Sequence, residues 1–113
     1  MSRPLRGEVW WVSLDPTVGR EQAGRRPGLV VSVDGLNQSG ADLVILLPIT
    51  SRDKGLRSHV EIRAGEAGLA ARSFAKCEDI RSVSVERLLG RQGRVAAATL
   101  AAVEERLRML LGL

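Results

Sequence analysis

Gly19-Arg20-Glu21-Gln22-Ala23-Gly24-Arg25-Arg26-Pro27 is a polar segment that separates two apolar runs, residues 9–12 (VWWV) and 29–31 (LVV). Such runs predict two strands joined by this segment. Its two glycines permit sharp backbone turns, and its closing proline fixes φ and disfavours helix at Arg26. Three guanidiniums, a carboxylate and an amide lie between those fixed points, more than a plain connection needs. We therefore expect a shaped, positively charged loop that holds phosphate.

Apolar segments on both sides of this loop predict a mainly β protein. Residues 28–33 are largely apolar and β-branched, which is typical of a central strand covered on both faces. The adjacent Trp10 and Trp11 must point to opposite faces of their strand, so we expect one in the core and one at an interface. The turn-rich residues 34–40 are expected to form a connection. The predicted strands are 8–14, 28–33, 42–49, 58–62, 72–80 and a short one at 88–95.

The C-terminal segment, residues 97–111, has helical rather than strand periodicity. No Ser, Asp or Asn stands just before it, so its N-terminal cap is weak, whereas Gly112 is placed to end it. Strands followed by one terminal helix predict a small, strongly bent β-barrel with the helix packed across it. The apolar stripe of this helix is expected in the core and comprises Leu100, Val103, Leu107 and Leu110.

Composition bounds the class of protein. The chain has 113 residues, 44% hydrophobic and 27% charged, as expected of one soluble globular domain spanning residues 1–113. It has no apolar run long enough to cross a bilayer and no signal peptide, and its single cysteine, Cys77, cannot form an internal disulfide. We therefore expect a cytoplasmic protein with no membrane contact, and a thiol that is a small buried hydrophobe.

The charge balance favours an anionic partner. The net charge is +4, carried by fifteen arginines and two lysines, and the arginines gather in the loops at 20–26 and 52–57. Such a surface fits nucleic acid or an acidic protein segment. One cysteine and one histidine exclude the usual zinc sites, and neither a P-loop nor a GxGxxG motif is present. What remains is a phosphate site without metal or cofactor, made from arginine, hydroxyl and carboxylate groups.

A series of motifs runs in order through nearly the whole chain. They are Arg6-Gly7-Glu8-Val9-Trp10, Asp15-Pro16-Thr17, Gly19 to Pro27, Leu47-Pro48-Ile49-Thr50-Ser51, His59-Val60-Glu61, Lys76-Cys77-Glu78-Asp79-Ile80-Arg81, Glu86-Arg87-Leu88 and Leu111-Gly112-Leu113. Together they closely resemble the MazF/PemK/Kid family of bacterial toxin endoribonucleases. The Glu-Gln-x-Gly-x-Arg-Pro core at 21–27 is the most specific of them.

The resemblance implies an SH3-like barrel with a C-terminal helix, of the type also found in CcdB, assembled as a homodimer. It also implies metal-independent cleavage of single-stranded RNA, often at a short sequence, giving a 2′,3′-cyclic phosphate and a 5′-hydroxyl. The implied partner besides RNA is an antitoxin whose acidic tail covers the site. In this reaction the ribose 2′-OH attacks its own phosphodiester, so the enzyme supplies no nucleophile.

The resemblance also implies the catalytic residues. Arg26 matches the family's catalytic arginine and is expected to stabilise the phosphorane, and Thr50 matches its catalytic threonine. Glu78 and Lys76 match positions that act as base and acid in some members. Aspartate is common at the position of Glu78, and arginine at the position of Lys76. Asp79 stands where glutamine is usual. Repulsion between the neighbouring carboxylates could raise the pKa of one of them, or both are simply solvated strand residues, which is the preferred interpretation for Asp79 but not for Glu78. Arg26 could instead pair with Glu21, and Thr50 could simply cap a strand end.

The remaining basic and polar residues are expected to contact RNA. The loop after Thr50 is either a solvated run of charge or a lip along which RNA lies, and His59 is expected on a strand surface, outside catalysis. The predicted RNA-binding residues are Arg20, Glu21, Gln22, Arg25, Ser51, Arg52, Lys54, Arg57 and Arg81.

Two other functions stay open. The same barrel can act without catalysis, as do the CcdB-type toxins that clamp DNA gyrase, and the altered set at 76–79 leaves room for that alternative. A plain RNA-binding barrel is the third candidate, and it predicts salt-dependent binding without products.

Overall fold

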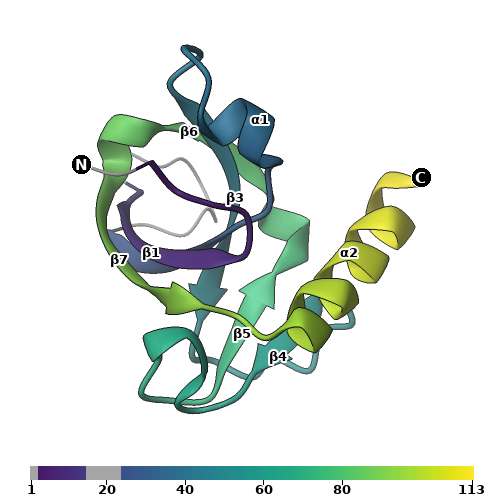
Figure 1. The fold of residues 1–113 in the computed structure, drawn as a ribbon. Coiled ribbons are helices and arrows are strands. Elements are labelled where there is room, and N and C mark those ends of the chain that lie inside the picture. The colour runs from purple at the N-terminus through teal and green to yellow at the C-terminus, as the bar shows by residue number, and fades with distance from the viewer. Residues whose placement is uncertain (1–2, 15–23) are drawn as a thin grey trace.

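The computed structural model describes residues 3–14 and 24–113, so most of the predicted loop at 19–27 lies outside the described residues. The described chain is mostly β-strand with one long C-terminal helix, as predicted (Figure 1). The strands are β1 (Glu8–Ser13), β2 (Arg25–Val30), β3 (Leu43–Thr50), β4 (His59–Ile62), β5 (Ser73–Lys76), β6 (Arg81–Ser84) and β7 (Leu88–Arg94). The helices are α1 (Asp34–Asn37) and α2 (Ala97–Leu111), with 3-10 turns η1 (Glu66–Gly68), η2 (Cys77–Asp79) and η3 (Val85–Arg87).

The strands form one curled antiparallel sheet in the order β4-β5-β3-β2-β1-β7, with β6 also paired to β3. No pairing joins β4 to β7 among the described residues, so the sheet bends as a barrel would but does not close by strand pairing. β3 is the central strand of the sheet. It pairs with β2 along one edge, and along its other edge it pairs first with β6 and then, near its end, with β5. Pro48, which has no N–H, falls in the gap between the β6 and β5 pairings, where no ladder bond is lost.

The core is divided between the two faces of β1, β2 and β3. Neighbouring residues such as Leu29 and Val30 are both fully buried but belong to different hydrophobic clusters. This explains the unbroken apolar run at 28–31, because a strand covered on both faces has no position left for a polar residue. The tryptophans follow the same alternation: Trp10 is 3% exposed and Trp11 is 40% exposed. Cys77 is buried as predicted, and its burial raises the pKa of the thiol to about 11.

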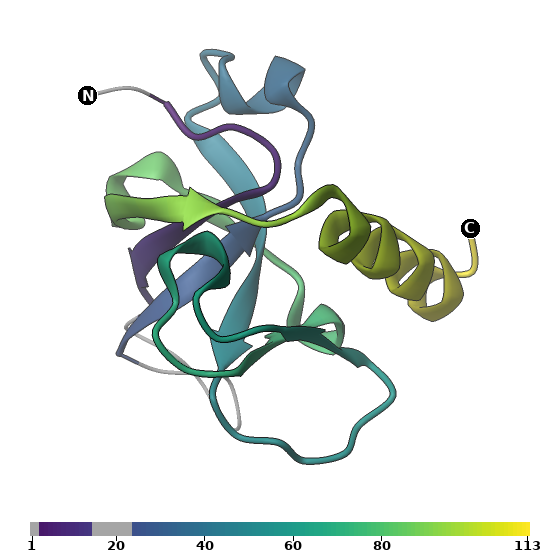
Figure 2. The same cartoon turned by 60° about the horizontal axis from the view of Figure 1, so that its bottom comes forward.

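Helix α2 lies beside β4 and η2 (Figure 2). Val103 is fully buried with Leu100 and Leu107 packed around it, but Leu110 is 46% exposed, so its predicted core position is wrong. Gly112 ends the helix with φ 70°, as predicted. The missing local cap is replaced from η1, because Oε2 of Glu66 accepts hydrogen bonds from Ala96 N (3.0 Å) and Thr99 Oγ1 (2.6 Å). None of the helices described is both long and apolar enough to traverse a bilayer.

Four element predictions differ from the structure, and those for β2 and β6 fail because pairing with distant segments overrides local pattern. β2 begins at Arg25, not at residue 28, because its first residues pair with Ser13 and Val12 of β1. The predicted strand at 72–80 ends with β5, and the chain then turns through η2, which contains the adjacent carboxylates of Glu78 and Asp79. The connection at 34–40 contains α1, and β6 was not predicted at all.

Candidate active site

A cleft of about 660 Å³ opens where β2 begins, β3 ends and β5 runs beside it. Five cationic side chains line it, and no carboxylate is among the lining residues in the described part of the chain. Its positive potential therefore suits an anion such as phosphate. The lining residues are Trp11, Arg25, Arg26, Pro27, Ile49, Thr50, Ser51, Arg52, Lys54, Ser73 and Lys76.

Arg25 and Arg26 reach the cleft from a strand and not from a loop. They pair with Ser13 and Val12 of β1, and Pro27 pairs with Trp11 in the next register position. The pairing of β2 with β3 begins only at Gly28, so the missing N–H of Pro27 removes no bond on that edge. The proline thus keeps Arg26 extended, as the sequence predicted, at the end of a strand held firmly by its neighbour.

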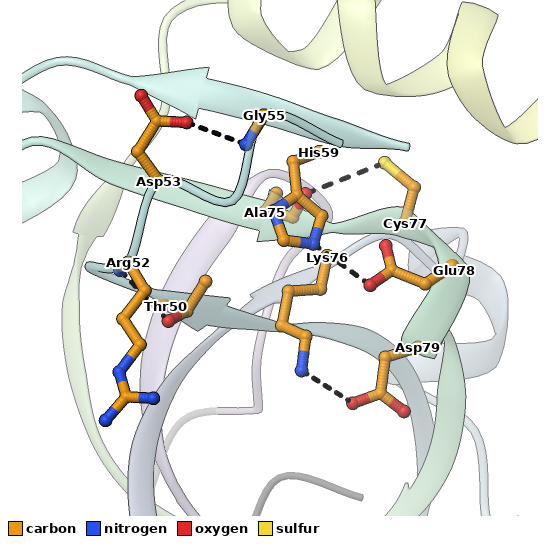
Figure 3. Close-up of polar contacts among 10 residues, drawn as sticks. All are labelled: Thr50, Arg52, Asp53, Gly55, His59, Ala75, Lys76, Cys77, Glu78 and Asp79. Atoms are coloured by element: carbon orange, nitrogen blue, oxygen red, sulfur yellow. Dashed lines mark hydrogen bonds and ion pairs between the residues drawn. The ribbon is translucent and has the colours of Figure 1, made fainter. Parts of the chain in front are cut away.

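Thr50 is the last residue of β3, and its side chain shapes the connection that follows. Its Oγ1 accepts a hydrogen bond from Arg52 N at 3.2 Å (Figure 3). Further along, Oδ1 of Asp53 accepts from Gly55 N at 3.0 Å, and Arg72 holds the other Asp53 oxygen at 3.4 Å. The basic connection is therefore organised by its own polar groups, and Ser51, Arg52 and Lys54 line the cleft.

Lys76 enters the cleft from the end of β5. Its Nζ lies 3.6 Å from Oδ2 of Asp79, and both side chains are largely buried, with 13% and 21% of their surface exposed. The 3-10 turn η2 makes this contact possible, because it folds the chain back within three residues (Figure 3). Asp79 is thus held in an ion pair, not solvated as the sequence suggested.

Glu78 pairs with His59 and not with Lys76. His59 Nε2 and Glu78 Oε2 are 3.0 Å apart, and the histidine side chain is only 3% exposed (Figure 3). The predicted surface position of His59 is therefore wrong. Burial acts to raise the pKa of Glu78, but hydrogen bonds from its own backbone N–H, Ser58 and His59 outweigh it and lower that pKa. The pKa of Glu78 is therefore lowered and not raised, so Glu78 is not the carboxylate whose pKa such repulsion would raise.

The structure gathers seven of the predicted site residues around the cleft: Arg25, Arg26, Thr50, Ser51, Arg52, Lys54 and Lys76. Glu78, Arg57 and Arg81 are not among the lining residues, and the predicted Arg20, Glu21 and Gln22 lie outside the described residues.

Sequence reasoning did not assign four of the lining residues to the site, Trp11, Pro27, Ile49 and Ser73, and it missed His59, the partner of Glu78. The exposed tryptophan beside a strand arginine was a usable signal. His59 gave none, because its partner is 19 residues away in the chain. Among the residues described, no group of three or more His, Cys, Asp or Glu is placed to hold a metal ion.

A curled antiparallel sheet with a C-terminal helix and a cationic cleft at its strand ends defines a small β protein built to hold a phosphate-bearing ligand. The family model described as PemK-like, MazF-like toxin of type II toxin–antitoxin system matches residues 5–111. The chain belongs to this family.

Similar proteins agree in sequence and in fold. Endoribonuclease MazF9 of Mycobacterium tuberculosis is 41% identical over 113 residues, with 96% of each chain covered. A crystal structure of MazF from Deinococcus radiodurans has a TM-score of 0.88 at 31% identity and covers 100% of both chains. A MazE–MazF structure from the same organism has a TM-score of 0.83 at 31% identity, covering 100% of this chain and 99% of the other.

Proposed function

We propose that the protein is the toxin of a type II toxin–antitoxin system and an endoribonuclease that cleaves single-stranded RNA without a metal ion. The observation that carries this proposal is the cleft, in which Arg26 and Thr50 lie together among cations. Family membership and the similarity to endoribonuclease MazF9 support it. Residues 1–113 form one toxin domain in this proposal, acting in the cytoplasm on messenger RNA.

The proposed reaction is an internal transfer of the phosphate. The ribose 2′-oxygen attacks the adjacent phosphorus, the 5′-oxygen leaves, and the products are a 2′,3′-cyclic phosphate and a 5′-hydroxyl. The enzyme has to align the attacking oxygen, stabilise the extra negative charge on the phosphorane and manage two protons. All of these tasks can be performed by side chains at or beside the cleft.

Each proposed role follows from the chemistry of the group. Arg26 stays protonated and offers paired N–H donors to the phosphorane oxygens. Thr50 Oγ1 already accepts from Arg52 N, so its hydroxyl hydrogen can be donated to a phosphate oxygen. Lys76 supplies a proton to the departing 5′-oxygen. Glu78 is the proposed base: its lowered pKa keeps it ionised at neutral pH, and it shares its carboxylate between His59 and the substrate.

The proposed protein partners are an antitoxin and a second copy of the chain. An antitoxin with an acidic tail fits a cleft lined by five cations, and the related MazE–MazF structure supports a partner of this kind. The end of α2 supplies an apolar surface for the homodimer, with Met109 69% and Leu113 86% exposed.

Purified protein incubated with a long single-stranded RNA in EDTA tests the proposal. We expect discrete cuts with 5′-hydroxyl ends, whose positions define the preferred sequence. RNA methylated at the 2′-oxygens should remain intact, because it lacks the nucleophile. Thr50→Val should cut far more slowly and Thr50→Ser nearly normally, which excludes a contaminating nuclease.

Intact RNA in this assay would overturn the proposal. Growth inhibition that persists in a non-cleaving protein, together with loss of gyrase supercoiling, would then identify a CcdB-type toxin. Salt-dependent RNA binding without products would identify a plain RNA-binding protein.

A further inference from the structure

A second, apolar hollow adjoins the cleft and has no role in the proposed chemistry. It has a volume of about 480 Å³ and is lined by Trp11, Arg25, Leu89 and Gly90. Trp11 and Arg25 line the cleft as well, so the two cavities share a wall. A strand of nucleic acid with its phosphate in the cleft can therefore place a nearby base in this hollow.

The backbone explains why Trp11 is available there. Trp11 pairs with Pro27 on one side and with Gly90 on the other, so these three residues form a row across β2, β1 and β7. Directly paired residues of antiparallel strands project on the same face. Gly90 has no side chain, and a Cβ placed on it would meet no atom within 4 Å. The indole therefore has open space beside it, in agreement with its 40% exposure.

The chemistry of this hollow fits a flat, partly apolar group tethered to a phosphate. An indole stacks on any nucleobase, and a neighbouring arginine can hold the phosphodiester that links the base to the cleft. Leu89, 46% exposed, adds an apolar wall. Ligand pockets for larger, drug-sized molecules begin at about 300 Å³, so a single base has room.

We propose that this hollow is a nucleobase subsite: a base one nucleotide beyond those that flank the scissile phosphate stacks on Trp11, while Arg25 binds the phosphate between them. The inference rests on the proposed endoribonuclease function and adds a specificity-determining residue to it. The subsite places one unpaired base at a fixed distance from the cut, which selects single-stranded over duplex RNA.

Binding of a short 2′-O-methyl RNA oligonucleotide, which cannot be cleaved, isolates this contact. Trp10 is 3% exposed and Trp11 40%, so a stacking base should quench the Trp11 emission and leave that of Trp10. Trp11→Phe should retain affinity within a few-fold while losing the quench. Trp11→Leu should bind roughly 5- to 100-fold more weakly, the range expected for one stacked base.

Cleavage of RNAs that carry a single abasic site at successive positions around the mapped cut locates the base. One position should slow the wild type, and Trp11→Leu should show no further loss on that RNA while losing rate on the others. Gly90→Leu fills the hollow from the neighbouring strand and should mimic Trp11→Leu. Gly40→Leu is the matched control, because Gly40 also has open space but precedes β3 at the end opposite Thr50.

Two results would overturn the subsite. One is a Trp11→Leu variant that binds and cleaves like the wild type. The other is a Trp11→Leu variant whose cleavage rate falls by the same factor, relative to the wild type, on every abasic RNA. Both require a wild type that cuts unmodified RNA, so they are distinguishable from failure of the proposed function. If the wild type cuts no RNA, the quench with the uncleavable oligonucleotide still decides: its absence overturns the subsite, and its presence supports it.

Discussion

Arginines occupy two contrasting regions of this molecule, the start of β1 and the cleft at the start of β2. Near the start of β1, three arginine side chains meet a carboxylate: Arg91 Nε lies 2.5 Å from Glu8, Arg3 lies 2.7 Å from Asp42, and Arg6 pairs with Glu104. At the cleft, Arg25, Arg26 and Arg52 line a cavity to which no described carboxylate contributes.

The contrast teaches that neighbours, not residue type, set the use of an arginine. A guanidinium beside a carboxylate is neutralised locally, and where the carboxylate is buried, as Glu8 is, loss of either partner costs stability. Several cations around one cavity instead raise its positive potential and attract an anion. Variants that remove one group from each region should therefore separate loss of activity from loss of stability.

Arg26→Ala should give the largest effect. Loss of one donor to the phosphorane is expected to lower the single-turnover cleavage rate roughly 10²- to 10³-fold. The free energy of unfolding should change by less than about 1 kcal/mol, as is usual for changes away from the core. Arg3→Ala removes the same charge from the other region and is the matched control. Equal rates for the two variants would remove the distinction between the regions.

Glu8→Ala should show the reverse behaviour. Glu8 accepts hydrogen bonds from Leu5 N (2.7 Å), Trp10 Nε1 (3.1 Å) and Arg91 Nε (2.5 Å), and its side chain is 7% exposed. Leaving these donors without an acceptor should lower the unfolding free energy by about 3 kcal/mol. Urea denaturation measures the loss, and cleavage per folded molecule should stay within a few-fold of the wild type.

The pH dependence of stability checks the same carboxylate. Burial acts to raise the pKa of Glu8, but hydrogen bonds from Arg91, Leu5 and Trp10 outweigh it and lower the pKa below its usual 4.5. A lowered pKa in the folded state means that the unfolded chain binds the proton more tightly. The stabilisation is therefore complete above pH 4.5 and is lost as pH falls through the lowered pKa. Glu8→Gln should flatten this acid limb in thermal unfolding.

Glu78→Gln tests a carboxylate that is near the cleft but paired with histidine. If Glu78 is the base, its loss should slow cleavage roughly 10²-fold. The pKa of Glu78 is lowered below 4.5 although burial acts to raise it. The base is therefore ionised at neutral pH, and the wild-type cleavage rate should fall only when the pH drops below 4.5. A full rate in Glu78→Gln would make the pair with His59 purely structural, and the cleft cations would act without it.

Glu66→Ala should have the smallest of these effects. Its carboxylate accepts from Ala96 N and Thr99 Oγ1 at the start of α2 and replaces the missing N-cap. Loss of a helix cap costs about 1 kcal/mol, which urea denaturation can resolve. Glu105→Ala, in the middle of the same helix, is the control and should change stability by about 0.5 kcal/mol or less.

Local pattern was enough to predict most of the fold. Strand alternation predicted that Trp10 and Trp11 face opposite sides, one of them buried, and the run at 28–33 indicated a strand buried on both faces. Helical spacing gave α2, and Gly112 gave its end. These signals are local, because each depends on how one residue follows the next along a strand or helix.

The candidate site was predictable only in part. The arginine before a proline and the threonine after a strand were identified from their motifs, and the structure places both at one cleft. The burial of His59 and its pair with Glu78 were not predictable, because β4 and η2 meet only when β5 folds against both β3 and β4.

The sequence alone determined most of the longer strands and the C-terminal helix, the strand covered on both faces, the excess of arginine and the resemblance to the family. Tertiary structure decided which charges meet a carboxylate and which line a cavity, that Glu66 caps α2 from 30 residues away, and that Gly90 leaves space beside Trp11. The physical reason is range. Backbone propensity and periodicity act over a few residues, whereas ion pairs, caps and cavities arise between segments brought together by burial of the core.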